Sequence, residues 1–163
     1  MTSDPRPFKL LFLCTGNSAR SILGEYILRK IAPRRFETYS AGADPTGTVN
    51  PYARRVLEEI YKMDTSEARS KSWDELEDVE FDFVITVCDN ARETCPVWPG
   101  QPILAHWGME DPAAAEGSDE EKLQVFRHTA LDLHRRLELL AALPFERLDK
   151  LRIQELTQEM ADR

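Results

Sequence analysis

KLLFLCTGNSARS, the stretch from Lys9 to Ser21, decides the fold of this chain. Its apolar run from Leu10 to Leu13 predicts a buried strand, which ends where Cys14 meets a loop that contains glycine, asparagine and serine. After this loop, apolar residues between Ile22 and Ile31 recur at helical spacing. The stretch therefore predicts a strand, a tight loop and a helix in direct succession.

The loop in this stretch is suited to bind an oxyanion. Five residues, TGNSA, separate Cys14 from Arg20, which is enough chain to surround an anion about the size of phosphate. The backbone N–H groups of such a loop point into one concavity, and the positive end of the helix dipole adds to their attraction. Gly16 supplies backbone freedom, and a guanidinium can bind two oxygens at once. The predicted oxyanion-binding residues are Thr15, Gly16, Asn17, Ser18, Ala19, Arg20 and Ser21.

Cys14 is the candidate nucleophile of this loop. The donors that attract an oxyanion also favour the thiolate form of a nearby cysteine, and Ser21 can add a hydroxyl hydrogen bond to the sulfur. The alternative is that Cys14 is a small buried residue that ends a core strand. The strand before the loop and the helix after it favour the reactive cysteine.

Composition and charge exclude several classes of protein. The 163 residues, with 42% hydrophobic and 31% charged residues, predict one domain over 1–163, with a catalytic core over 8–142 and a helical tail over 143–163. The net charge of −8 argues against nucleic acid or an anionic membrane as a partner, because both require basic surface. No apolar run approaches a membrane span and the N-terminus lacks the apolar core of a signal peptide, so we expect a cytoplasmic protein.

The rest of the chain alternates between strand and helix patterns. Further strands are expected at 37–40, 81–87 and 102–105, and helices at 51–63, 123–140 and in the tail. This alternation predicts an α/β three-layer sandwich on a four-stranded parallel sheet, with a C-terminal helical extension. Ligands bind beyond the carboxyl ends of such strands, where both Cys14 and Cys88 lie.

The three cysteines, Cys14, Cys88 and Cys95, are an odd number without the close paired spacing of a zinc site. We therefore predict neither a structural disulfide framework nor a bound cofactor. Cys88 and Cys95 enclose the polar segment CDNARETC, and two interpretations stay open for them. They are one buried and one incidental cysteine, or they are members of a thiol relay that works by thiol–disulfide exchange.

Asp111 lies in a loop after the last predicted strand. A carboxylic acid at this position can reach over the anion site and act as a general acid for a leaving oxygen. The dipeptide Asp111-Pro112 is also a common turn, so a purely structural role stays open.

Several motifs, in order along the chain, resemble the thioredoxin-coupled arsenate reductases, which share a fold with the low-molecular-weight protein tyrosine phosphatases. The resemblance extends over about residues 8–140 and leaves out the tail. The motifs are CTGNSARS at 14–21, YSAG at 39–42, VNP at 49–51, VITVCDNARETCP at 84–96 and HWGMEDPA at 106–113.

The resemblance implies a mechanism as well as a fold. Cys14 would attack the arsenic of arsenate while Arg20 and the loop amides hold its oxygens and Asp111 protonates the departing oxygen. Cys88 would then attack the Cys14 adduct, so that arsenite leaves and a Cys14–Cys88 disulfide forms. Cys95 would attack Cys88 and leave a Cys88–Cys95 disulfide for thioredoxin to reduce.

The resemblance also raises the question of a cation. Asn17, Glu25 and Ser40 match positions that bind potassium in some relatives. Trp73 and Glu75 stand where threonine and aspartate are expected in the rest of that site, which argues against bound potassium.

Two other functions stay open. The first is a phosphatase that uses Cys14, Arg20 and Asp111 on phosphoesters, with Cys88 protecting the nucleophile from overoxidation. The second is a module that binds arsenate or phosphate without turnover. Cys95 separates these hypotheses, because a phosphatase has no use for it and the relay cannot finish without it. The sequence does not distinguish thioredoxin from mycothiol or glutaredoxin as the reductant.

Overall fold

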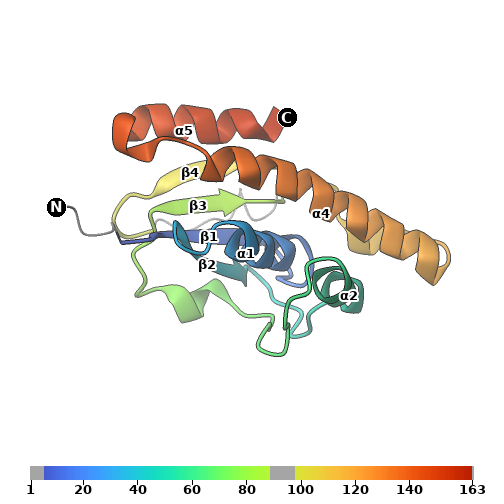
Figure 1. The fold of residues 1–163 in the computed structure, drawn as a ribbon. Coiled ribbons are helices and arrows are strands. Elements are labelled where there is room, and N and C mark those ends of the chain that lie inside the picture. The colour runs from blue at the N-terminus through green and yellow to red at the C-terminus, as the bar shows by residue number, and fades with distance from the viewer. Residues whose placement is uncertain (1–5, 89–97, 163) are drawn as a thin grey trace.

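The strands of the computed structural model, which describes residues 6–88 and 98–162, form a four-stranded parallel sheet. Their order across the sheet is β2-β1-β3-β4 (Figure 1). The strands are β1 (Phe8–Cys14), β2 (Phe36–Gly42), β3 (Phe83–Thr86) and β4 (Ile103–His106). The predicted α/β class and four-stranded parallel sheet are confirmed. Strand β3 begins two residues later and ends one residue earlier than its pattern indicated, and β4 is displaced by one residue.

The central strand β1 is the apolar run that opened the chain. Its residues from Leu10 to Leu13 are all fully buried, as expected for a parallel strand covered on both faces. It pairs with β2 on one side and with β3 on the other, so that Cys14 lies opposite Gly42 and Leu13 lies opposite Thr86. Cys14 is the last residue of β1 and Cys88 comes shortly after β3. The two cysteines therefore lie at the carboxyl ends of neighbouring strands.

Helices α1 (Arg20–Ile31) and α4 (Asp119–Ala141) contact each other and lie together on one face of the sheet (Figure 1). Helix α2 (Pro51–Glu59) packs against both of them. A Cβ atom at Gly24 would lie 2.9 Å from the ring of Phe12, so this glycine lets α1 approach β1 closely. Asn50 caps α2 by accepting a hydrogen bond from Tyr52 N, and Pro51 is the first residue of this helix.

Aromatic residues and a short 3-10 turn pack near β2, an edge strand of the sheet. Tyr39 packs edge-on against Phe81, which packs edge-on against Trp98. The 3-10 turn η1 (Trp73–Leu76) contacts β2, the edge strand at the opposite end of the sheet from β4. Within the described residues, no helix is both long and apolar enough to cross a membrane.

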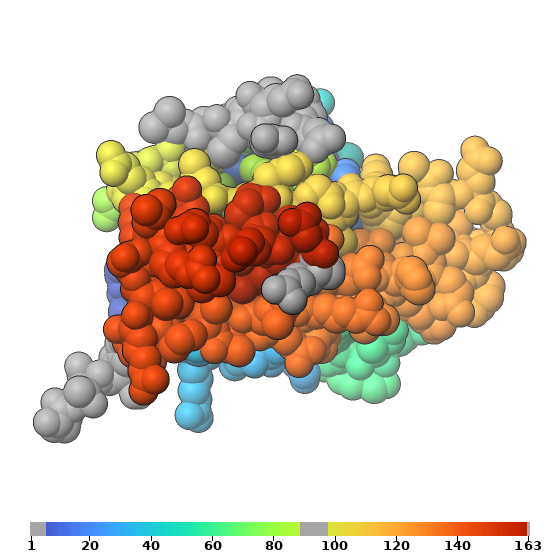
Figure 2. Space-filling model, turned by 90° about the horizontal axis from the view of Figure 1, so that it is seen from above, coloured from blue at the N-terminus to red at the C-terminus, as the bar shows by residue number. Residues whose placement is uncertain are grey.

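The tail forms the predicted helix, α5 (Lys150–Glu159), between the 3-10 turns η3 (Phe145–Arg147) and η4 (Met160–Asp162). Figure 1 and Figure 2 show α5 beside β4, the strand at one edge of the sheet. Ile153 and Met160 of the tail are buried, so the extension packs on the rest of the chain.

Candidate oxyanion site

The loop between β1 and α1 is held by hydrogen bonds that fix the direction of its peptide groups. The carbonyl oxygens of Thr15, Gly16 and Ser18 accept bonds from the next segment of the chain, at Asp44 N, Thr46 N and Asn50 N. A trans peptide directs its N–H away from its carbonyl, so the N–H groups of Gly16, Asn17 and Ala19 face the other way. Asn17 adopts a left-handed conformation, with φ of 46°, which this residue type tolerates. These orientations give the inner side of the loop the donors that an oxyanion requires.

The sulfur of Cys14 receives two polar contacts from this loop. Asn17 N donates to Cys14 Sγ at 3.3 Å, and Ser21 Oγ lies 3.0 Å from the same sulfur. The Asn17 side chain donates from Nδ2 to Ser21 Oγ at 2.8 Å, which directs the hydroxyl hydrogen of Ser21 toward the sulfur. The orientation of the Asn17 amide is in turn fixed by Lys71 N, which donates to Asn17 Oδ1. Two contacts from the loop and the start of α1 thus position the Cys14 sulfur.

Cys88 lies beside the same loop. Its sulfur is 3.3 Å from Thr15 Oγ1, and the residue is 8% exposed. The sequence placed Thr15 in the oxyanion loop for its backbone, but gave no sign that its hydroxyl would contact a cysteine 73 residues away. Cys95 lies outside the described residues.

Arg20 and Asp111 meet across the mouth of the loop. Arg20 Nη1 donates to Met109 O at 2.9 Å, and Arg20 Nη2 lies 3.9 Å from Asp111 Oδ2. The Asp111 side chain is 49% exposed and its Oδ1 accepts a bond from Ala113 N, which begins the 3-10 turn η2 (Pro112–Ala114). The segment after β4 thus brings a carboxylic acid to the cation that begins α1.

Two residues that the sequence analysis did not select support the loop from outside. Ser70 Oγ donates to Gly16 O at 2.9 Å, and Lys71 N donates to Asn17 Oδ1 at 2.9 Å. Both contacts join residues 54 positions apart. No local pattern around Ser70 marks this function, because the contact depends on the path of the chain across the sheet.

Gly42 pairs with Cys14 on the neighbouring strand and has no room for a side chain. A Cβ atom there would lie 2.5 Å from Thr15 O, and backbone atoms cannot move away cheaply. We expect Gly42→Ala to lower the free energy of unfolding by about 1 to 3 kcal/mol and to weaken phosphate binding, because the loop must shift. Urea unfolding and phosphate titration measure the two effects.

Gly100 provides the control for this substitution. It has positive φ, and the atom nearest to an added Cβ, Glu80 Oε1, lies at an ordinary contact distance of 3.5 Å, so Gly100→Ala strains the backbone without a clash. Gly100→Ala should lower stability and leave phosphate affinity unchanged. Equal phosphate affinity in Gly42→Ala and the wild type would contradict the tight contact between Gly42 and the loop.

The three residues compared with a potassium site are already engaged with protein donors. Glu25 Oε1 accepts from Ser40 Oγ at 2.5 Å, and Asn17 Oδ1 accepts from the backbone of Lys71. The Lys71 ammonium donates to Ser40 O at 3.0 Å. Burial lowers the pKa of Lys71, and the nearby Glu25 carboxylate opposes this shift. These residues do not fit a potassium ion, and the described residues contain no group of three or more metal-binding side chains of the His, Cys, Asp and Glu types.

Lys71 therefore gives a prediction about monovalent ions. We expect the wild type to have the same melting temperature in KCl and NaCl at equal ionic strength, because an ammonium already lies against Ser40 O. Lys71→Met should lower the free energy of unfolding by about 1 to 3 kcal/mol and make it higher in KCl than in NaCl, since Ser40 O loses its cationic donor while Glu25 keeps only its ion pair with Arg29. Lys30→Met, on the exposed end of α1, is the control. A potassium effect on the wild type would contradict this prediction.

A strand, a candidate oxyanion loop with a cysteine and an arginine, and an acid from the segment after the last strand of a parallel sheet together indicate the class of protein. The chain belongs to the low molecular weight phosphotyrosine protein phosphatase family, whose model matches residues 9–154. It is 40% identical over 132 residues to an arsenate reductase from Halalkalibacterium halodurans, an alignment that covers 81% of this chain and 94% of that protein.

Two solved structures of arsenate reductases are also similar to this chain. A structure described as an arsenate reductase in the phosphate binding state superposes with a TM-score of 0.69 at 29% identity, over 83% of this chain and 97% of that one. A thioredoxin-dependent arsenate reductase from Corynebacterium glutamicum superposes with a TM-score of 0.56 at 25% identity, over 85% of this chain and 65% of that one.

Proposed function

We propose that this protein reduces arsenate to arsenite with Cys14, Cys88 and Cys95, and that thioredoxin returns it to the reduced state. The observation that carries the proposal is the contact of Cys88 Sγ with Thr15 Oγ1 at 3.3 Å, which places a second thiol beside the loop that holds the first. A phosphatase needs only the first thiol. The names of the relatives, which include arsenate reductases and a thioredoxin-dependent one, support the same reaction.

The first step forms a bond between Cys14 and arsenic. The Cys14 thiolate, which Asn17 N and Ser21 Oγ contact, attacks arsenic while the loop N–H groups and Arg20 hold the arsenate oxygens. An oxygen leaves as water after it receives a proton from Asp111, which lies 3.9 Å from Arg20 Nη2. The product is a Cys14 thioester of arsenic in which arsenic is still pentavalent.

The second step transfers two electrons. The Cys88 thiolate attacks Cys14 Sγ, a disulfide forms between the two sulfurs, and the sulfur–arsenic bond breaks with its electron pair on arsenic. Arsenic leaves as trivalent arsenite. Thr15 contributes by holding the Cys88 sulfur at the edge of the loop.

The third step frees the nucleophile. The Cys95 thiolate attacks Cys88 Sγ, so that Cys14 leaves as a thiolate and a Cys88–Cys95 disulfide remains. The dithiol of thioredoxin reduces this disulfide, and the cycle begins again. The anionic substrate meets a chain of net charge −8, so its capture depends on the donors of the loop and on Arg20.

The second candidate function is hydrolysis of phosphoesters on the same site. The contacts among the loop, Arg20 and Asp111 do not involve Cys88, so they would serve a Cys14 phosphoenzyme equally well. The family to which the chain belongs is named for such an activity.

The test is arsenate-dependent NADPH consumption by the purified protein with thioredoxin and thioredoxin reductase. We expect one arsenite for each NADPH consumed, and no consumption when phosphate replaces arsenate. Hydrolysis of an aryl phosphate without arsenate turnover would contradict the proposal and favour the phosphatase. Phosphate binding without either reaction would favour a module that only binds oxyanions.

A further inference from the structure

The residues that follow α4 are attached to the end of β4. Gln158 of α5 contacts both backbone groups of His106: His106 N donates to Gln158 Oε1 at 2.7 Å, and Gln158 Nε2 donates to His106 O at 2.9 Å. The indole of Trp107, which is fully buried, donates from Nε1 to Thr157 O at 2.9 Å. Three hydrogen bonds thus connect two successive residues of α5 to the last residue of β4 and the one after it.

These contacts matter because β4 is an edge strand. One side of β4 pairs with β3, where Trp107 N also donates to Thr86 O at 2.7 Å. The outward N–H and C=O groups of an edge strand have no partner strand, and such strand ends open readily. Gln158 takes the place of a neighbouring strand at His106.

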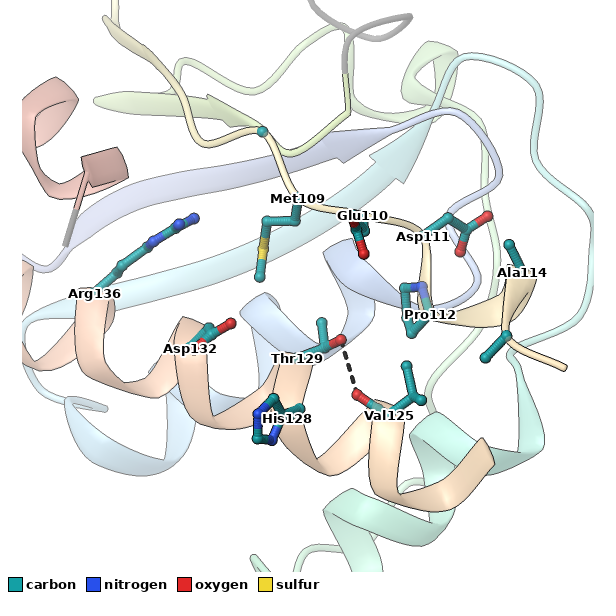
Figure 3. A pocket seen from close by; sticks show the side chains of 12 residues that line it. Met109, Glu110, Asp111, Pro112, Ala114, Val125, His128, Thr129, Asp132 and Arg136 are labelled. Carbon is teal, nitrogen blue, oxygen red and sulfur yellow. Dashed lines mark hydrogen bonds between the residues drawn. The ribbon is translucent and has the colours of Figure 1, made fainter. Parts of the chain in front are cut away.

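The segment that β4 supports carries the acid of the site. Asp111 follows His106 by five positions, and between them Met109 O accepts the bond from Arg20 Nη1. A pocket of about 740 Å³ lies between this segment and α4, with Met109, Glu110 and Asp111 on one wall and Val125 and Thr129 on the other (Figure 3). This pocket lies between α4 and the residues Glu110 and Asp111, whereas Met109 also packs partly against the hydrophobic core.

Arg20 holds the middle of the segment at Met109 O, and further contacts hold its two ends. At the far end, η2 contacts α4 and Pro112 is buried. At the near end, His106 and Trp107 are held by Gln158 and Thr157. The tail that carries Gln158 and Thr157 is in turn bound to α4, because Arg136 Nη2 donates to Ala161 O at 3.1 Å.

We infer that the C-terminal extension is a positioning element of the active site, in which Gln158 holds the end of β4 and thereby places Asp111 opposite Arg20. Gln158 is a positioning residue and touches no substrate. The inference rests on the proposed function, in which Asp111 donates the proton to the leaving oxygen.

Hydrogen exchange of the segment tests the structural part of the inference without any catalytic assay. We expect amides of residues 106–111 to exchange at least about threefold faster in Gln158→Ala than in the wild type. Gln154→Ala, an exposed glutamine one turn earlier on α5, is the matched control and should leave exchange at 106–111 unchanged. Equal exchange in Gln158→Ala and the wild type would overturn the inference.

A double-mutant comparison tests whether Gln158 acts through Asp111. We expect Gln158→Ala to lower kcat for arsenate by about three- to tenfold with little change in KM, because the acid is misplaced while the anion loop is intact. Gln158→Glu, which keeps the acceptor for His106 N, should lose less. In an Asp111→Asn background, Gln158→Ala should add no further loss.

The outcomes separate the inference from the function on which it rests. An equal loss from Gln158→Ala with and without Asp111 would overturn the inference, because the loss would then be a general structural one. No arsenate turnover in the wild type, together with faster exchange only in Gln158→Ala, would contradict the proposed function and support the contact between tail and segment.

Discussion

Cys14→Ser will abolish both arsenate-dependent NADPH consumption and hydrolysis of an aryl phosphate, whereas Cys88→Ser will abolish only the first. In the proposed mechanism both reactions begin with attack by the Cys14 sulfur, and a serine hydroxyl in the same contacts is not ionised at neutral pH. We expect a loss of about four orders of magnitude or more for Cys14→Ser. Cys88 acts only in the electron transfer, so a phosphoenzyme can still form and hydrolyse without it.

The proposed relay predicts a further difference between Cys88 and Cys95. Cys95→Ser should complete one reduction and stop as a Cys14–Cys88 disulfide, which peptide mapping under non-reducing conditions detects. Cys88→Ser should form no disulfide at all. Phosphate titration provides the control, because all three variants keep the loop donors and should bind phosphate. Repeated turnover of arsenate by Cys88→Ser would contradict the relay.

The sequence predicted those parts of the site that are local. The order of strand, loop and helix around Cys14 follows from apolar spacing within a few residues, and the structure has the same order. The prediction that Cys14 and Cys88 lie at the carboxyl ends of parallel strands is also confirmed, and the structure makes these two strands neighbours. The roles of Arg20 and Asp111 stay predictions, although the structure brings the two side chains to 3.9 Å.

Several contacts that the sequence did not predict join segments that are distant in the chain. The Thr15 hydroxyl and Cys88 are 73 residues apart, Ser70 and Gly16 are 54 apart, and Gln158 and His106 are 52 apart. A hydroxyl or amide side chain at such a position carries no periodicity, and its partner depends on how loops cross the sheet. Lys71 is a similar case, because its ammonium lies against Ser40, a residue that the resemblance associated with potassium.

The second large effect is expected at Arg20. Its guanidinium donates from Nη1 to Met109 O while Nη2 lies near Asp111, so its planar fork connects the oxyanion loop to the segment that carries the acid. A lysine at this position keeps the charge but offers only one nitrogen, which cannot replace both ends of the fork. We expect Arg20→Lys to lower kcat/KM for arsenate by about two to three orders of magnitude and Arg20→Ala by more.

Two measurements separate the contribution of Arg20 to anion binding from its contribution to holding the acid-bearing segment. Weaker phosphate binding by Arg20→Lys would report the lost contacts to the anion, and faster hydrogen exchange at 106–111 would report the lost bond to Met109 O. Arg55→Lys, in the exposed ion pair with Glu59 on α2, controls for the exchange of an arginine for a lysine and should change neither quantity. If Arg20→Lys kept kcat/KM within about twofold of the wild type, a single positive charge at the start of α1 would suffice. The forked contact between the loop and the acid-bearing segment would then have no part in the reaction.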